Sequence, residues 1–230
     1  MCGRFTLRKD TDALAAHFAA EAPPAGARPA APRYNIAPTQ AIPVVRAGAA
    51  TGRPELVWMR WGLDPPWAST PGGAPPLINA RAETLAAKPA FRDSFRARRC
   101  LIPADGFYEW QKLDRAKQPW FIHFPDDRLF AFAGIWRPGR GADGAPRDCC
   151  AIITTAPVPA LARLHDRMPA IQRPGDYAAW LDRSLADPAA LSPLLAPGRT
   201  LAAAAELHLY PVRATVNRAA NDSPACIAAA

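Results

Sequence analysis

The residue with the most distinctive chemistry in this sequence is Cys2, because removal of Met1 turns it into an amino-terminal cysteine. Such a residue carries an α-amine with a pKa of roughly 7.7–8.0 and a thiol with a pKa of about 8.5, so both are partly deprotonated near neutral pH. The amine forms a reversible imine with an aldehyde, and the thiol then closes the imine to a durable five-membered thiazolidine. An internal cysteine has no free α-amine and cannot do this. The plain alternative is that Cys2 is only a small residue after the initiator.

Polar residues in three later motifs could support such chemistry. Period-two alternation places Asn79 and Arg81 on one face of a strand. Glu109 lies among aromatic residues, where an inward orientation would raise its pKa by desolvation and suit it to proton transfer. The alternative is that Glu109 points outward to solvent. His165 is the one histidine inside a markedly polar motif, although a lone histidine is more often structural.

The composition limits the classes of function. A net charge of +8 and a pI near 9.7 favour a polyanionic partner, although an Ala-, Arg- and Pro-rich sequence from GC-rich coding would give the same charge. The five cysteines form no CxxC pair, so we expect neither a metal site nor a disulfide framework, and no cofactor. Charged residues near the start argue against a signal peptide, and no apolar run approaches the roughly 20 residues of a membrane span. We therefore expect a cytoplasmic protein with reduced thiols and no membrane partner.

The elements that must position these residues are mainly strands. Alternating apolar segments between Gly, Asp and Pro clusters predict strands at 42–45, 55–61, 77–81, 100–103, 106–112, 120–124, 129–136, 149–155 and 206–212. Helical spacing predicts helices at 11–20, 158–164, 175–184 and 187–195, and a basic amphipathic stretch at 84–99. Residues 33–38 read as a turn, residues 22–32 and 64–76 as loops, and the arginine run at 96–99 as a solvated face. The pattern predicts one α+β domain over residues 1–230, with an antiparallel, barrel-like β core flanked by helices.

The polar motifs together identify a family. They run in order along the chain: MCGRF at 1–5, RYNIAP at 33–38, WG at 61–62, INARAET at 78–84, ADGFYEW at 104–110, QPWFI at 118–122, ITTAP at 153–157, LHDRMPAI at 164–171 and VNRAANDSP at 216–224. Each motif alone is weak, but their number and order are specific. In these motifs the chain resembles the SOS-response-associated peptidase (SRAP) family, the abasic-site processing proteins. The resemblance implies a β-barrel-like fold with helices and a basic groove for single-stranded DNA.

The resemblance also implies a mechanism. After loss of Met1, Cys2 would condense with the ring-opened aldehyde of an abasic site, giving a thiazolidine crosslink between DNA and protein. Glu109 matches the family's acid/base carboxylate. His165 matches a histidine expected to help open the sugar ring and to assist crosslink reversal. Asn79 would orient the Cys2 amine and the sugar by hydrogen bonds.

For DNA, the resemblance points to arginines as phosphate ligands, which position a strand without reading its sequence. The candidates are Arg4, Arg81 and Arg167, and Trp67 could stack on a base. Pro38 and Thr154 match positions near the lesion pocket. We expect abasic single-stranded DNA as the partner, a monomeric protein, and association with the nucleoid when DNA is bound. Extra Ser, Pro and Gly residues after Trp67 leave its contact with DNA open.

Three other functions compete with this reading. A cysteine peptidase, mainly one that removes its own Met1, could nominally use Cys2, His165 and Asn79. An amino-terminal-nucleophile amidotransferase also begins with Cys-Gly, but it would need glutamine-binding motifs that the sequence lacks. A plain single-stranded-DNA binding module would leave Cys2 inert.

Overall fold

The computed structural model describes residues 2–23, 32–65, 74–114, 116–140, 145–196, 198–199, 204 and 206–230. The strands are β1 (Phe5–Leu7), β2 (Arg33–Ile36), β3 (Ala41–Ala47), β4 (Pro54–Trp61), β5 (Asn79–Arg81), β6 (Arg99–Ala104), β7 (Gly106–Lys112), β8 (Lys117–His123), β9 (Phe130–Arg137), β10 (Cys149–Thr155), β11 (Met168–Pro169), β12 (Ile171–Gln172) and β13 (His208–Pro211). The α-helices are α1 (Thr11–His17), α2 (Arg92–Ala97), α3 (Pro159–Ala162), α4 (Tyr177–Leu181) and α5 (Pro188–Leu191). Single 3₁₀ turns are η1 (Ala82–Thr84), η2 (Pro174–Asp176), η3 (Ser192–Leu195), η4 (Ala214–Asn217) and η5 (Pro224–Ile227).

Five strands close into a barrel. β10 pairs with β4, β4 with β3, β3 with β6, β6 with β9, and β9 pairs again with β10. The pairings are antiparallel except that β10 runs parallel to β4 and to β5. β5, β11 and β12 extend the sheet beyond the ring. The predicted α+β class with a barrel-like core is confirmed, and the parallel pairs make its sheet mixed.

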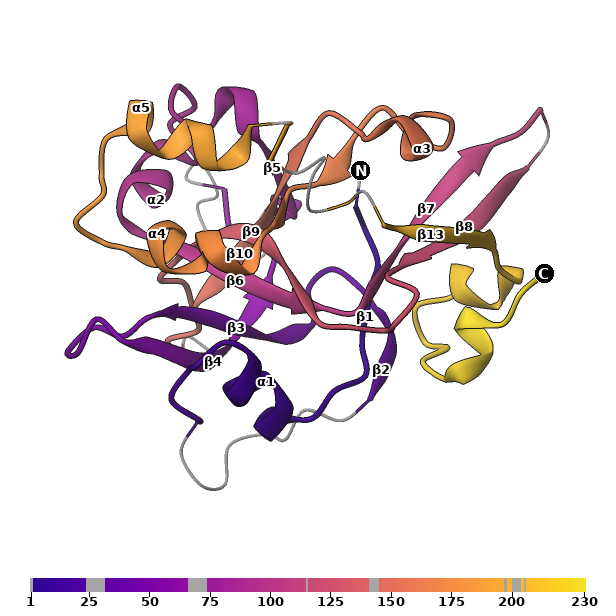
Figure 1. Cartoon of the computed structure of the whole chain (residues 1–230), viewed down its shortest axis with the longest axis horizontal. Coiled ribbons are helices and arrows are strands. Elements are labelled where there is room, and N and C mark those ends of the chain that lie inside the picture. The colour runs from indigo at the N-terminus through magenta and orange to yellow at the C-terminus, as the bar shows by residue number, and fades with distance from the viewer. Residues whose placement is uncertain are drawn as a thin grey trace.

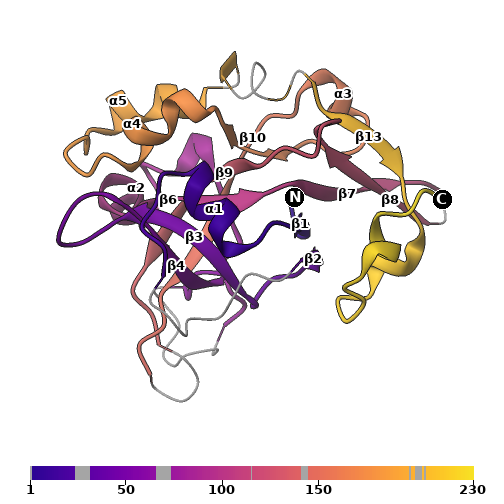
Figure 2. The same cartoon turned by 60° about the horizontal axis from the view of Figure 1, so that its bottom comes forward.

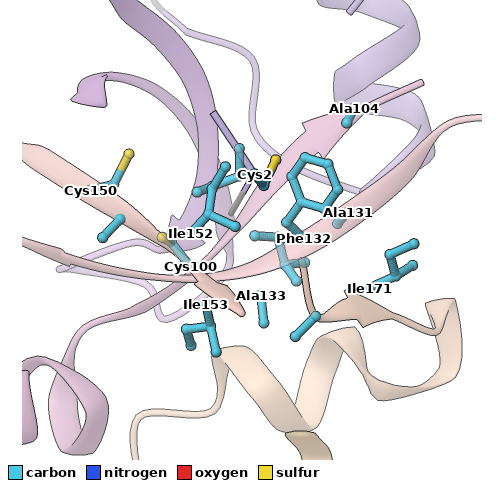
Figure 3. Close-up of a cluster of buried hydrophobic side chains, with 14 of the residues drawn as sticks. Cys2, Cys100, Ala104, Ala131, Phe132, Ala133, Cys150, Ile152, Ile153 and Ile171 are labelled. Carbon is cyan, nitrogen blue, oxygen red and sulfur yellow. The ribbon is translucent and has the colours of Figure 1, made fainter. Parts of the chain in front are cut away.

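A second sheet packs against this barrel. Its strand order is β13-β8-β7-β1-β2, with β7 and β8 forming the long ribbon at the right of Figure 1. Phe5 of β1 and Phe107 of β7 each pack edge-to-face against the ring of Phe132 in β9, at centroid distances of 5.9 Å. One buried apolar cluster therefore contains side chains from both sheets, and Cys2, Phe132 and Ile152 are among those drawn in Figure 3.

The helices are shorter than the sequence predicts. Asp10 caps α1 and accepts the amide of Ala13 at 2.8 Å, but the helix ends at His17 rather than at residue 20. In the stretch that includes Pro89, only α2 is α-helical. Figures 1 and 2 both show α2, α4 and α5 on the side of the molecule away from the β7–β8 ribbon. No helix in the described part of the chain is long and apolar enough to cross a membrane.

The predicted solvated arginine face at 96–99 is wrong for Arg99, which is 4% exposed. Its guanidinium donates to the carbonyls of Phe95, Arg96, Trp180 and Asp182, so it links the ends of α2 and α4. Buried Arg is tolerated when its donors are all engaged in this way.

The predicted turn at residues 33–38 is also mostly wrong, because residues 33–36 form β2, antiparallel to β1. Asp222, far away in the sequence, accepts the backbone amide of Asn35 at 2.9 Å and pairs with the Arg33 side chain at 2.8 Å. Only Pro38 and Thr39 turn. The RYNIAP and VNRAANDSP motifs thus hold the carboxy-terminal segment against β2.

The corner between β6 and β7 positions the strand that carries Glu109. Asp105 is fully buried and accepts from the Thr6 hydroxyl and from the backbone amide of Arg8, both at 2.6 Å. A Cβ at Gly106 would clash with the ring of Phe121 and lie 2.8 Å from Thr6 Oγ1. Glycine is therefore required at the start of β7, and this corner fixes β7 beside β1.

Candidate functional site

Cys2 immediately precedes β1 and is completely buried. Among the described residues, its thiol makes one long contact, 3.9 Å from Sγ to the carbonyl of Arg4. Burial raises the pKa of the thiol well above its usual range, and the negative charge of Glu109 raises it further. Cys2 therefore holds a protonated thiol within electrostatic reach of a carboxylate. Met1 lies outside the described residues.

Asn79 holds the backbone of Cys2. Its side-chain Nδ2 donates to the Cys2 carbonyl at 2.9 Å. Position 79 opens β5, which lies parallel to β10 with Asn79 opposite Ile152. Ala80 is buried while its two neighbours turn the other way, so the predicted shared face of Asn79 and Arg81 is confirmed. The other amide oxygen, Asn79 Oδ1, is buried without a hydrogen-bond partner among the described residues, and it is available to accept from an amine.

Glu109 points inward and is 3% exposed, so the inward alternative is the correct one. Phe107 and Glu109 share the face of β7 toward the main core, whereas Tyr108 and Trp110 belong to a second cluster on the other face. Burial raises the pKa of Glu109 to about 7, and the negative charge of Asp166 raises it as well. A carboxyl group with this pKa can both accept and return a proton near neutral pH.

His165 follows α3 and is held by its own loop. Its Nδ1 accepts the backbone amide of Arg167 at 3.0 Å and lies 2.7 Å from a carboxylate oxygen of Asp166. One nitrogen cannot accept from the amide and donate to the carboxylate in the same protonation state. Burial lowers the pKa of His165, which favours the neutral ring with Nδ1 as acceptor and the proton on Nε2. The contact with Asp166 becomes an ion pair when the ring is protonated.

Arg167 connects three parts of the site. Its guanidinium makes a two-point contact with the Glu83 carboxylate at 2.8 and 2.9 Å, and it also donates to the carbonyl of Thr154. The Arg167 hydrogen bonds lower the pKa of Glu83. Thr154 is buried in β10, opposite Arg81 of β5. Arg167 therefore fixes the loop that carries His165 to β10 and to the turn η1 that follows β5.

Arg4 is also engaged by the protein. Its Nη1 donates to Asn35 Oδ1 at 2.8 Å and to the carbonyl of Val216 at 2.9 Å, and its Nη2 lies 3.4 Å from the carbonyl of Asn217. Burial lowers the pKa of the guanidinium. The same Asn35 amide donates to three carbonyls of the segment 216–221. Arg4 thus ties the strand that follows Cys2 to the carboxy-terminal segment.

A groove of about 500 Å³ begins beside Cys2. It is lined by Gly3, Arg4, Pro38, Trp110, Lys117 and Asn217. The indole of Trp110 donates to Asn217 Oδ1 at 2.8 Å, which fixes the ring at the groove wall. Arg81 is exposed, and its guanidinium has no hydrogen bond or ion pair within the described ranges. Trp67 lies outside the described residues.

The structure brings together Cys2, Asn79 and the carboxylate of Glu109, whose charge acts on the thiol, and Asp166 connects them electrostatically to the His165 loop. Sequence reasoning gave no role to Glu83, Asp166, Trp110, Lys117 or Asn217. All five belong to or adjoin the quoted motifs, but only the fold shows what they contact. Within the described part of the chain, no group of three or more His, Cys, Asp or Glu residues could hold a metal ion.

Known proteins are similar to this chain in sequence and in fold. Residues 1–219 match the family model described as SOS response associated peptidase (SRAP). The abasic site processing protein YoqW of Bacillus subtilis (strain 168) is 40% identical over 229 residues, covering 99% of each chain. The abasic site processing protein HMCES of Gallus gallus is 32% identical over 229 residues, covering 85% of this chain and 66% of its own.

Solved structures agree. A protein of Bacteroides thetaiotaomicron superposes over 100% of both chains with a TM-score of 0.84 at 24% identity, which supports the fold alone. A phage-related protein of Bordetella bronchiseptica gives a TM-score of 0.69 at 28% identity, covering 92% of this chain and 94% of its own. The family match over nearly the whole length, with relatives of this identity and coverage, shows that the chain belongs to the SOS response associated peptidase (SRAP) family.

Proposed function

We propose that this protein processes abasic sites in single-stranded DNA by forming a covalent crosslink through Cys2 once Met1 is removed. The observation that carries the proposal is the arrangement around Cys2. The negative charge of the buried Glu109 acts on the Cys2 thiol, and the Asn79 side chain donates a hydrogen bond to the Cys2 carbonyl. The relatives named as abasic site processing proteins supply the substrate class. In this proposal the whole chain acts as one monomeric unit in the cytoplasm and joins the nucleoid when it binds DNA.

The proposed chemistry is a condensation that needs no oxidant or reductant. The Cys2 amine attacks the aldehyde carbon of the ring-opened abasic sugar to form a carbinolamine, which loses water to give an imine. The Cys2 sulfur then bonds to the same carbon, and its proton moves to the nitrogen, closing the thiazolidine. Conversion of the imine removes the species that drives β-elimination, so the DNA strand stays intact.

Glu109 is proposed to move the protons in these steps. Its pKa of about 7 lies close to the roughly 7.7–8.0 of an α-amine, so transfer of a proton from the ammonium to Glu109 is nearly thermoneutral. The protonated Glu109 then gives that proton to the departing hydroxyl of the carbinolamine. Because burial and the charge of Glu109 keep the thiol protonated, the amine attacks first and the thiol second.

Asn79 and His165 are proposed to position and activate the reactants. The unpartnered oxygen of Asn79 can accept a hydrogen bond from the Cys2 amine while its nitrogen holds the Cys2 carbonyl. The neutral His165 ring carries its proton on Nε2, from which it can donate to the sugar during ring opening and take part in crosslink reversal.

The groove beside Cys2 is proposed to take the DNA strand. Arg81 is exposed and makes no hydrogen bond or ion pair with the described residues, so we propose it as the arginine that contacts a phosphate. Arg4 and Arg167 contribute positive charge but already bind protein groups, which gives them a positioning role as well. Pro38 and Thr154 line or support the lesion pocket, and Trp67 is proposed to stack on a base.

A general cysteine peptidase fits the geometry less well. Such enzymes depend on a thiolate whose pKa is lowered by neighbouring positive groups. Here burial and the charge of Glu109 raise the pKa of the Cys2 thiol. We therefore restrict the proposed peptidase activity to removal of the protein's own Met1.

Intact mass spectrometry of the protein with an oligonucleotide carrying one abasic site tests the proposal. The spectrum should show loss of Met1 and a heat-stable adduct that has lost one water. Cys2→Ala and Cys2→Ser should give no heat-stable adduct without reduction, because neither can close a thiazolidine, and each should give one only after borohydride reduction of its imine. Cys149→Ala, which removes a different buried thiol, should behave as wild type. A heat-stable adduct of Cys2→Ser without reduction would contradict the thiazolidine.

A further inference from the structure

A second cationic hollow lies away from the site described above. It has a volume of about 300 Å³ and forms where the ends of β3 and β9, the start of β6 and the end of α4 meet. Arg99 opens β6, while Asp105, which leads into β7 and Glu109, follows its last residue. At about 3.4 Å per residue, the length of β6 separates the hollow from that corner by roughly 17–20 Å. The hollow and the groove beside Cys2 share no lining residue.

Four arginines line this hollow, and two of them are committed to the protein. Arg46 pairs with Glu55 at 2.7 Å and with Asp148 at 2.6 Å, and its guanidinium carbon lies 4.5 Å from the ring centroid of Trp136. Arg99 donates only to carbonyl oxygens, so its positive charge is not neutralised by a carboxylate hydrogen bond within the described residues. The charge of Arg46 is therefore balanced by two carboxylates, and Arg99 supplies the fixed positive charge of this wall.

The side chains of the other two arginines pair with no carboxylate in the described part of the chain. Arg98 is half-buried, and in the described part of the chain its side chain has neither a hydrogen bond nor an ion pair. Arg183 is exposed, and its one hydrogen bond within the described residues is a 3.5 Å contact with the carbonyl of Ala49. Within the described residues neither guanidinium pairs with a carboxylate, and both lie at one hollow near the buried positive charge of Arg99.

This arrangement suits a phosphate group. Guanidinium groups bind phosphate with two parallel, charge-assisted hydrogen bonds. The carboxylates of Glu55 and Asp148, which adjoin the hollow, are already paired with Arg46. The half-buried Trp136 and the apolar Leu181 give the rest of a ligand a nonpolar wall. An adjoining hollow of about 490 Å³ shares Ala47, Leu181 and Arg183 with this one, which leaves room beyond the phosphate.

We propose that this hollow is a second anion-binding site, in which Arg98 and Arg183 bind the phosphate of a nucleotide-sized ligand. The phosphate belongs either to a free nucleotide or to a nucleic-acid strand. The proposal does not depend on crosslinking through Cys2, because the two sites share no residue.

Calorimetric titration with inorganic phosphate, thymidine 5′-monophosphate and an undamaged oligothymidylate tests this site. The double variant Arg98→Gln/Arg183→Gln should bind the probes about 10-fold or more weakly, since it loses the charge-assisted hydrogen bonds. The matched control Arg92→Gln/Arg96→Gln removes equal charge from exposed positions of α2 outside the hollow and should change affinity less than about 2-fold. Tighter binding of the monophosphate indicates a free nucleotide, and tighter binding of the oligothymidylate indicates a strand.

Three results would overturn the proposal. They are equal weakening in the two double variants, equal binding of acetate and phosphate, or no binding of any probe at about 10 mM. The single variant Arg98→Lys keeps the charge but loses the two-point geometry, so it should fall between wild type and the double variant. Thermal unfolding of each variant verifies that the fold is kept, and crosslinking to abasic DNA provides an independent readout of the Cys2 site.

Discussion

Replacing Glu109 by Gln should make the protein more stable above neutral pH while making it a poorer catalyst. In the folded protein the pKa of Glu109 is about 7, above its ordinary value of 4.5, because the carboxylate is desolvated. At pH values between these two pKa values, the folded state binds more protons than the unfolded state. The free energy of unfolding therefore falls as the pH rises through this range. Each unit of pKa difference is worth about 1.4 kcal/mol, which gives a loss of about 3 kcal/mol by pH 8. Neutral Gln does not carry this cost.

Urea unfolding followed by tryptophan fluorescence measures the effect. The free energy of unfolding of Glu109→Gln minus that of wild type should become more positive by about 3 kcal/mol between pH 4.5 and pH 8. All other titrating groups are shared by the two proteins, so they largely cancel in the difference. Over the same series, the rate of crosslinking to an abasic oligonucleotide should fall about 10²–10⁴-fold in the variant, which has lost its proton carrier.

Glu206→Gln provides the matched control, because Glu206 is an exposed carboxylate with a side chain that is 67% accessible. Its difference from wild type should stay nearly constant with pH. A flat difference for Glu109→Gln would show that the Glu109 carboxylate is not desolvated in solution. A crosslinking rate equal to wild type would refute the role of Glu109 in proton transfer, whatever its pKa.

Three further changes test the rest of the site. Asn79→Ala removes the amide that holds the site cysteine, so the crosslinking rate should fall about 10-fold and the free energy of unfolding by about 1 kcal/mol. Arg81→Ala should lower the dependence of log affinity for single-stranded DNA on log salt by about 0.7, the value for one lost phosphate contact, whereas Arg92→Ala should leave that slope unchanged in the same fluorescence anisotropy titration. Gly106→Ala pushes a methyl group into the ring of Phe121 and should cost about 1–3 kcal/mol in urea unfolding, and an unchanged midpoint would mean that the β6–β7 corner relaxes freely.

Local patterns in the sequence were sufficient for much of the barrel and for one wall of the site. Alternation alone placed Asn79 and Arg81 on one face, because a strand side chain reverses with every residue whatever its partners are. For Glu109 the same rule left the inward and outward orientations open, because it could not decide which face of β7 is buried. Both faces are covered, since one faces the main core and the other faces the cluster of Tyr108 and Trp110.

The errors in the sequence-based predictions came from partners far away in the chain. Residues 33–36 are turn-like in composition, yet they form a strand because β1 and the Asp222 carboxylate supply the hydrogen bonds. Arg99 has the polarity of a surface residue, yet it is buried because the ends of α2 and α4 present carbonyl oxygens to it. The Asp222 carboxylate and the α4 carbonyls that accept from Arg99 lie far away in the sequence, so the neighbouring residues do not reveal them. Tertiary context therefore overrode local propensity at both places.

In the proposed mechanism, the burial that gives Glu109 its pKa also determines how the amine and the thiol of Cys2 are used. A dry site penalises every charged form, so it raises the pKa of both the carboxyl and the thiol. For the carboxyl, this brings the pKa near that of an α-amine and makes it an effective proton carrier. For the thiol, it suppresses the thiolate, so a reaction that began at sulfur would be slow, whereas attack by the amine needs only one proton transferred to Glu109. The same desolvation therefore disfavours peptidase chemistry through the thiol and favours condensation that begins at the amine of Cys2.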